Sequence, residues 1–213
     1  MTFAEIVKNG CNEWNLPITD EAVTRMERFS DALIEKNRVM NLTAVTEPEE
    51  IARRHMLDCL FLLTITEFKG KKVLDIGCGW GAISLALALE SPEASVYAID
   101  VNERAIELTE RNAELNCCAN IHAGEAADVP EGLEFELIWS NPPIRIGKQE
   151  LHTLLMTWLP RLAPDGYAYL VVQKNLGSDS LMRWLAQALG STFTVAKYAS
   201  SKGYRVIEVH RLP

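Results

Sequence analysis

The fold of this chain is decided by one stretch of its sequence, Lys72-Val73-Leu74-Asp75-Ile76-Gly77-Cys78-Gly79-Trp80-Gly81. Residues 73–76 are apolar except for one acid, a pattern that is typical of a short buried strand. The glycines that follow allow the backbone to turn sharply and to lie close to a ligand. The apolar residues 82–90 then predict a helix, whose first N–H groups have no partner inside the helix. The stretch therefore predicts a strand, a ligand-binding glycine turn and a helix.

Asp75 indicates which ligand this turn binds. Gly77-x-Gly79-x-x-Ala82 also satisfies the fingerprint of dinucleotide-binding turns, so the glycines alone do not identify the ligand. A carboxylate two positions before the first glycine would repel a pyrophosphate, whereas it suits a cationic group such as the ammonium of S-adenosylmethionine. A second predicted strand, 96–100, ends in Asp100 about 20 residues after the turn, the usual spacing for an acid that binds ribose hydroxyls. The alternative is a generic doubly wound domain that binds a nucleotide or no ligand.

Asp75, the turn and Asp100 together resemble the cofactor motifs of class I S-adenosylmethionine-dependent methyltransferases. The resemblance implies S-adenosylmethionine as the cofactor, with its methionine part near Asp75 and its ribose at Asp100. Glu125 and Ala126, in the stretch 123–126, would border the adenine. The cofactor-binding residues that it implies are Asp75, Gly77, Gly79, Ala82, Asp100, Val101, Glu125, Ala126 and Asn141.

The composition is that of an ordinary globular protein. Of the 213 residues 48% are hydrophobic and 23% are charged, and the net charge of −8 counts against a protein that coats nucleic acid indiscriminately. No apolar run approaches the roughly 20 residues of a membrane span, and the first residues lack the regions of a signal peptide. We therefore expect a cytoplasmic protein without a membrane partner. The five cysteines are odd in number and lack metal-ligand spacing, so we expect reduced thiols and no metal.

The chain divides into two predicted domains. Residues 1–69 read as amphipathic helices near 3–14, 20–39 and 48–65, and we expect them to form a helical cap in front of the first strand. From residue 70 strands and helices alternate, which predicts an α/β fold with a doubly wound, mostly parallel, seven-stranded Rossmann-like sheet. Pro164-Asp165-Gly166 and Lys202-Gly203 are expected turns. The expected strands lie near 72–76, 95–100, 119–123, 135–140, 167–173, 192–198 and 204–210, and the expected helices near 81–91, 103–116, 149–160 and 178–189.

The fourth predicted strand is followed by Ser140-Asn141-Pro142-Pro143-Ile144, and this stretch indicates which kind of atom accepts the methyl group. Ligands of open α/β sheets bind beyond the carboxyl ends of the strands. Each proline fixes its own φ and restrains the residue before it, so the Asn141 side-chain oxygen and the Pro142 carbonyl become two preset acceptors. Two acceptors suit an exocyclic amine, because they turn its conjugated nitrogen toward the methyl group. The predicted catalytic residues are Asn141, Pro142 and Pro143.

Residues from about 71 to the C-terminus resemble the small methyltransferase domain of bacterial small-subunit rRNA guanine-N2 methyltransferases. The resemblance lies in Asn141-Pro142-Pro143, Val171-Val172-Gln173-Lys174 and Lys202-Gly203-Tyr204-Arg205-Val206. One departure is Ile144, which stands where that family has an aromatic residue that stacks on the target base. Lys174 and Arg205 are further candidates for RNA phosphates. The substrate-binding residues expected from this resemblance are Ile144, Arg145, Lys148 and Lys202.

The N-terminal residues resemble a different family. Asn41-Leu42-Thr43-Ala44-Val45 and Arg53-Arg54-His55-Met56-Leu57-Asp58 are similar to the helical front of the small-subunit rRNA guanine-N7 methyltransferase, also called glucose-inhibited division protein B. That resemblance covers roughly residues 1–77. The hypothesis that follows is a fusion, natural or engineered, with a crossover near residues 74–81.

The predicted function is S-adenosylmethionine-dependent methylation of guanine N2 in small-subunit (16S) ribosomal RNA, with the RNA or the small ribosomal subunit as partner. The alternatives are guanine-N7 methylation, methylation of a protein glutamine, and a chimeric scaffold that binds the cofactor without turnover.

Overall fold

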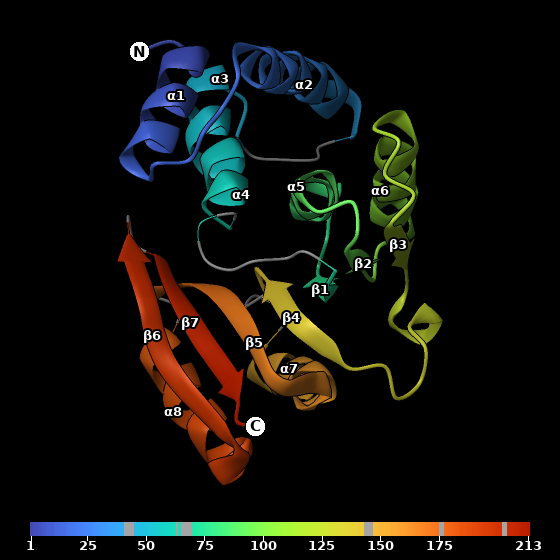
Figure 1. Ribbon diagram of the computed structural model, residues 1–213, viewed down its shortest axis with the longest axis vertical. Helices are drawn as coiled ribbons and strands as arrows, with labels where there is room; N and C mark the ends of the chain where they lie inside the picture. The colour runs from blue at the N-terminus through green and yellow to red at the C-terminus, as the bar shows by residue number, and fades with distance from the viewer. Residues whose placement is uncertain (41–44, 63, 65–69, 143–146, 175–176, 202–203) are drawn as a thin grey trace. The chain divides into compact units, whose positions relative to one another are not determined.

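The computed structural model describes residues 1–213 except 41–44, 63, 65–69, 143–146, 175–176 and 202–203 (Figure 1). The chain divides into two compact units, Met1–Glu67 and Phe68–Pro213. No helix in the described ranges is long and apolar enough to cross a membrane.

The first unit is helical. Thr2 and Glu5 form a capping box at the start of α1, and the Thr19 hydroxyl caps α2 by accepting a bond of 3.1 Å from the Ala22 N–H. A Cβ added to Gly10 would lie 2.5 Å from Cδ2 of Leu57, so α1 and α4 approach each other closely at this glycine. The elements are α1(Phe3–Glu13), α2(Asp20–Met40), α3(Pro48–Ile51), the π-helical turn η1(Ala52–Met56) and α4(Leu57–Leu62).

The second unit contains a seven-stranded sheet in the order β3-β2-β1-β4-β5-β7-β6. The first five strands of the chain pair in parallel, whereas β7 pairs antiparallel with both β5 and β6. The predicted doubly wound, mostly parallel sheet of seven strands is confirmed. The strands are β1(Lys72–Ile76), β2(Ser95–Ile99), β3(Ile121–Gly124), β4(Phe135–Ser140), β5(Leu162–Gln173), β6(Phe193–Ser201) and β7(Tyr204–Arg211).

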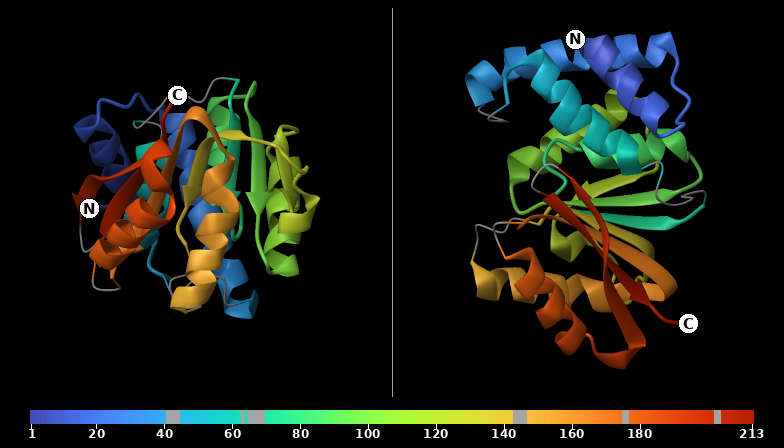
Figure 2. Two further views of the ribbon diagram at one scale, coloured as in Figure 1. Left: turned by 90° about the horizontal axis from the view of Figure 1, so that it is seen from below. Right: turned by 90° about the vertical axis from the view of Figure 1, so that its left-hand side faces the viewer.

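Helices cover both faces of this sheet. Figures 1 and 2 show α7(Lys148–Trp158) and α8(Ser178–Ala188) on one face, and α5(Ala82–Glu90) and α6(Glu103–Leu115) on the other. Leu155 of α7 and Leu185 of α8 are fully buried in one apolar cluster with Leu170 of β5 and Ile207 of β7. This cluster packs α7 and α8 against β5 and β7. The described residues of this unit also form the short 3₁₀ turns η2(Ala126–Asp128), η4(Leu159–Arg161) and η6(Gly190–Thr192).

Most expected strand bounds differ from the structure by three residues or fewer, but the start of β5 differs by five. Pro164-Asp165-Gly166 was predicted as a turn that precedes a strand at 167–173, but β5 begins at Leu162 and includes these residues. Phe135 pairs with Leu162 and Leu137 pairs with Tyr167, so residues 163–166 bulge from the strand without ending it. Asp165 has a φ of 62°, and a Cβ on Gly166 would lie 2.8 Å from the Ala163 carbonyl oxygen. Turn-forming residues therefore form a bulge here.

Candidate cofactor and acceptor site

The candidate residues converge on one edge of the sheet. Glu125, Asp100, Gly77 and Asn141 each directly follow the last residue of β3, β2, β1 and β4, which are neighbours in that order. Because these strands are parallel, their carboxyl ends meet at the same edge. The chain passes from β1 to β2 on one side and β4 lies on the other, which is the switch point where open α/β sheets bind ligands. The structure thus brings together residues that four separate motifs predicted.

The glycine turn has a backbone that only glycines adopt easily. Gly77, Gly79 and Gly81 have φ values of 77°, 59° and 83°. The N–H groups of Gly77 and Cys78 donate to the carbonyl oxygen of Ile99 over 2.8 and 3.0 Å, which ties the turn to the end of β2. A Cβ added at Gly77 or Gly79 would meet no atom within 4 Å, so space lies open in front of the turn.

Helix α6 supports the turn through residues that the sequence analysis missed. The buried Thr109 hydroxyl donates to the Gly79 carbonyl oxygen over 3.1 Å, and the Asn112 amide donates to that of Trp80 over 2.8 Å. A Cβ added to Gly81 would lie 2.8 Å from Cγ2 of Thr109, so the helix also fills the space beside this glycine. The available signal was a threonine in the apolar stripe of an amphipathic helix, a position where a polar side chain needs a partner.

Asp75 is buried in β1 beneath the turn, with 1% of its surface exposed. Its carboxylate accepts a bond of 2.6 Å from the Ser84 hydroxyl and a second bond from the Ser84 backbone N–H. Burial raises the pKa of Asp75 to about 6; the two Ser84 bonds oppose this rise and the charge of Asp100 adds to it. Asp75 thus fastens the first turn of α5 to β1. Its contact with a methionine ammonium stays a prediction, as does that of the half-buried Ala82, the first residue of α5.

Asp100 connects the end of β2 to the turn. One carboxylate oxygen accepts from the Gly79 N–H and the other from the Asn102 N–H, both over 3.0 Å. A carboxylate oxygen offers two acceptor sites, so each still has capacity for a ribose hydroxyl. Val101 beside it is 95% exposed, which leaves its side chain available to a ligand.

Glu125 and Ala126 are exposed at the end of β3. The Glu125 N–H donates to Asp128 over 2.8 Å, while the Glu125 side chain accepts from the Asp128 N–H. This reciprocal cap holds the 3₁₀ turn 126–128, and Gly124 makes room for it, since a Cβ there would lie 2.7 Å from an Asp128 oxygen. Asp128 was not predicted, although two acids three residues apart resemble the spacing of a capping box.

The end of β4 is held against β1. The buried Ser140 hydroxyl donates to the Ile76 carbonyl oxygen over 2.9 Å. The next side chain, Asn141, is exposed, whereas Pro142 is buried. Within the described part of the chain no hydrogen bond to the Asn141 amide is found, so its oxygen is available to a substrate. The predicted site residues Pro143, Ile144, Arg145 and Lys202 lie outside the described residues.

The predicted cationic residues differ in availability. Lys148, the first residue of α7, and Lys174, directly after β5, are exposed. Arg205 is 15% exposed and its guanidinium forms an ion pair with Asp179 of α8, so it already has an anionic partner. Among the residues that the structure covers, no three His, Cys, Asp or Glu side chains are grouped to hold a metal ion.

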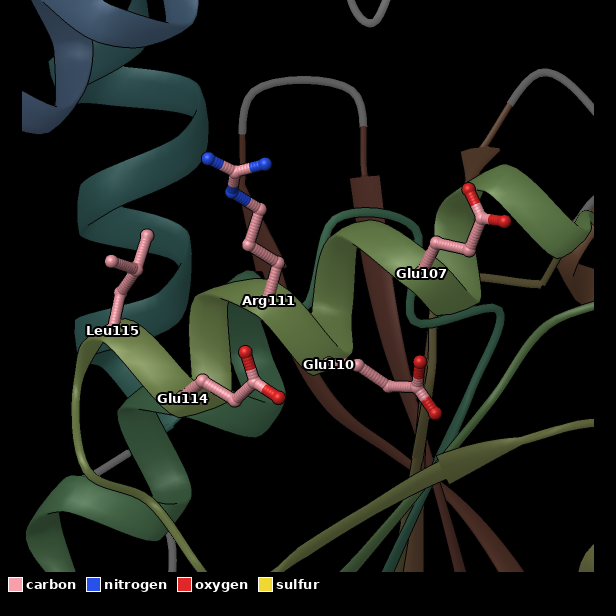
Figure 3. A pocket seen from close by; sticks show the side chains of 5 residues that line it. All are labelled: Glu107, Glu110, Arg111, Glu114 and Leu115. Carbon is pink, nitrogen blue, oxygen red and sulfur yellow. The ribbon is translucent and has the colours of Figure 1, made fainter.

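A surface hollow of about 390 Å³ lies along α6, apart from the predicted site residues. Figure 3 shows its charged side chains pointing in several directions from the helix, so they do not converge on one ligand atom. The lining residues are Glu107, Glu110, Arg111, Glu114 and Leu115.

Comparison with known proteins gives three kinds of similarity. The family model of the methyltransferase small domain matches residues 56–208. The chain is 34% identical over 143 residues to the uncharacterized protein YbxB of Bacillus subtilis, a match that covers 66% of this chain and 70% of YbxB. It is 33% identical over 163 residues to ribosomal RNA small subunit methyltransferase G of Geobacter sulfurreducens, covering 76% of this chain and 73% of that protein.

Among solved structures, the 16S rRNA N2 methyltransferase RsmC of T. thermophilus, in complex with AdoMet and guanosine, superimposes with a TM-score of 0.61. It is 22% identical in sequence, and the match covers 74% of this chain and 43% of RsmC, which supports the same fold. The match to methyltransferase G is longer than the N-terminal stretch 1–77, so it includes part of the second unit. The fusion stays a hypothesis.

Proposed function

Because this chain belongs to the methyltransferase small domain family, whose cofactor is S-adenosylmethionine, we propose that it methylates the N2 amine of guanine in small-subunit ribosomal RNA. The observation that carries the proposal is the position of Asn141. It is exposed directly after β4, at the edge where β1 and β2 end in the glycine turn and Asp100.

The residues at this edge fit the cofactor. The open space before Gly77 and Gly79 accommodates a ligand close to the backbone. The remaining acceptor sites of Asp100 suit two ribose hydroxyls, and the buried carboxylate of Asp75 gives the turn a negative field that favours an ammonium group. When bound, S-adenosylmethionine supplies an electrophilic methyl group on its sulfonium.

The acceptor end of the site suits an exocyclic amine. The lone pair of guanine N2 is conjugated with its ring, so the amine needs hydrogen bonds from both N–H groups to orient it. The Asn141 side-chain oxygen and the Pro142 carbonyl supply two such acceptors. The bond from Ser140 to Ile76 and the burial of Pro142 hold this backbone in place on both sides of Asn141. Alignment of this kind contributes several kcal/mol to a transfer reaction in general, roughly 7 or more in the best cases.

The relatives support RNA as the substrate class. The name of the Geobacter relative states small-subunit ribosomal RNA, and the description of the T. thermophilus neighbour states N2 methylation and bound guanosine. Exposed Lys148 and Lys174 stand at the same edge of the sheet, where they can pair with backbone phosphates. Such contacts position an RNA strand without reading its sequence.

A second candidate is methylation of guanine N7. It is favoured by the N-terminal resemblance to the N7 family and by the relative named methyltransferase G. N7 carries an in-plane lone pair that is free to attack and needs no hydrogen bonds to orient it. Methylation of N7 therefore does not use the two acceptors at Asn141 and Pro142.

Two modified transcripts of small-subunit RNA distinguish the candidates. Inosine lacks the exocyclic amine and keeps N7, whereas 7-deazaguanosine keeps the amine and lacks N7. With methyl-labelled S-adenosylmethionine, label should enter the 7-deazaguanosine transcript and not the inosine transcript. The reverse result would support N7, and no transfer to natural RNA by a protein that binds the cofactor would support a non-catalytic scaffold.

Variants of Asn141 test its role in the same assay. Asn141→Ala should slow transfer roughly a hundredfold or more, as loss of one preset polar group at a reacting centre does. Asn141→Asp retains an acceptor oxygen and should lose less. Cofactor affinity should fall less than the rate in both variants, so an equal loss of affinity and rate would contradict the assignment.

A further inference from the structure

Tyr204 and Tyr198 are both strongly exposed aromatic side chains of the second unit, and they differ in their place in the sheet. Tyr204 is 40% exposed, whereas Trp139, Trp158 and Tyr169 are each less than 5% exposed. Tyr204 is the first residue of β7 and pairs with Gln173, the last residue of β5. Because β7 runs antiparallel to β5 (Figure 1), its first residue lies at the carboxyl edge of the parallel strands, the edge that carries Asn141.

The tyrosine is fixed in this position from three sides. Gln173 donates from its side-chain amide to the Tyr204 hydroxyl over 3.0 Å. The Ser200 hydroxyl donates to the Tyr204 carbonyl oxygen over 3.3 Å, and the next residue, Arg205, is ion-paired to Asp179 of α8. The first contact restrains the ring and the other two restrain the backbone that carries it, so the exposed ring loses less conformational entropy when a flat ligand covers it.

The register of the sheet gives the distance from Tyr204 to the acceptor site. Ser140 pairs with Leu170, so Asn141 is level with Val171, two residues before Gln173. Two residues along a strand and two strand spacings across the sheet place Tyr204 about 12 Å from Asn141. A single nucleic-acid strand advances about 3.4 Å per nucleotide when stacked and further when splayed. The two residues can therefore contact different nucleotides of one strand.

We propose that Tyr204 is a stacking platform for a base that lies a few nucleotides from the methylated guanine on the same RNA strand. This inference rests on the proposed function and adds a second contact point to it. Stacking on an aromatic ring is available to every base and needs no pattern of donors and acceptors. Lys174 is exposed directly after Gln173, the residue that pairs with Tyr204, so a cation for a backbone phosphate follows the same strand end.

Tyr198 provides a matched control. It is 42% exposed, close to the value for Tyr204, but it lies within β6 and its ring packs edge-on against Tyr169 at 5.3 Å between centroids. Its position in the bulge between Lys197 and Ala199 is opposite the middle of β7, away from the carboxyl edge. Loss of this tyrosine should leave RNA affinity unchanged.

The experiment measures the affinity of the full chain, with S-adenosylmethionine present, for a short single-stranded RNA that contains one central guanine. Tyr204→Ala should bind it roughly 5- to 150-fold more weakly, the range found for one stacked base, and Tyr198→Ala should bind it like the parent. Tyr204→Phe keeps the ring but loses the bond from Gln173, so its loss should be much smaller than that of Tyr204→Ala. Cofactor affinity, measured by calorimetry, should be the same in all four proteins.

An RNA series without individual bases tests the contact with the unaltered protein. An abasic nucleotide at one position near the guanine should weaken binding to the parent by about the factor that Tyr204→Ala causes, and should weaken Tyr204→Ala no further. Equal affinity of Tyr204→Ala and the parent, or an equal loss in Tyr198→Ala, would overturn the inference alone. Absence of RNA binding and of RNA methylation by the parent would overturn the proposed function as well.

Discussion

The buried carboxyl of Asp75 leads to a prediction about stability that can be worked out from the structure. Its pKa is raised from an ordinary value of 3.8 to about 6, chiefly by burial. One pKa unit corresponds to about 1.36 kcal/mol, so ionised Asp75 costs the folded state roughly 3 kcal/mol. The raised pKa means that the folded state binds the Asp75 proton more tightly than the unfolded state does, so stability falls as the pH rises. The cost is therefore absent below about pH 4 and develops fully as the pH rises past about 6.

Asp75→Asn removes this cost and keeps an acceptor oxygen for the Ser84 hydroxyl. The variant should be more stable than the parent by about 1–3 kcal/mol at pH 8, because the loss of charge-assisted bonds offsets part of the gain. At pH 4 the advantage should disappear. The price of the substitution is weaker binding of S-adenosylmethionine, whose ammonium loses the negative field beneath the turn.

Urea unfolding of both proteins at several pH values between 4 and 8 measures the difference in their free energies of unfolding. The other titrating groups are the same in both proteins, so their contributions cancel in this difference. Ser84→Ala serves as the control, since it removes the hydroxyl donor and should destabilise the ionised form more than the protonated one. The reasoning would be refuted by a variant that is less stable than the parent at pH 8, or by a stability difference that does not change with pH.

Three further substitutions test the turn, the core and the cofactor contact. Gly81→Ala should destabilise the protein by about 2–4 kcal/mol in urea unfolding, because φ is 83° and the new Cβ would lie 2.8 Å from the Thr109 methyl carbon. Adding Thr109→Ser should restore part of that loss, and an unchanged loss would contradict the steric argument. Leu155→Ala, at a fully buried position of α7, should cost about 2–5 kcal/mol in the same assay, and a cost below about 1 would show that the core closes over the cavity. Asp100→Ala should weaken S-adenosylmethionine binding by about 1–3 kcal/mol in calorimetry, and unchanged affinity would remove Asp100 from the site.

The framework of the sheet could be predicted well because buried strands and helices leave a periodic pattern of apolar residues in the sequence. β1 and β4 begin and end where they were expected, since apolar runs are bounded there by glycines, acids or prolines. The order of Asp75, Asp100, Glu125 and Asn141 along one edge follows from the parallel topology, which the alternation of strands and helices implies.

Contacts between distant side chains could not be predicted in the same way. Periodicity indicates that Thr109 is buried but not that it bonds to Gly79, thirty residues earlier in the chain. It also gives no sign that Asp75 is paired with Ser84, or that Asp128 caps Glu125. The bulge at residues 163–166 was missed because proline, aspartate and glycine favour both turns and bulges, and the pairing partner decides between them.

The central claim is that Asn141 and Pro142 direct methyl transfer to an exocyclic amine. Mass spectrometry of nucleosides tests it most directly, with small-subunit ribosomal RNA that has been incubated with the protein and S-adenosylmethionine. The structure leads us to predict N2-methylguanosine, formed by the parent and nearly lost in Asn141→Ala. A product that is 7-methylguanosine without N2-methylguanosine would contradict the account and assign the chemistry to the family that the N-terminal residues resemble.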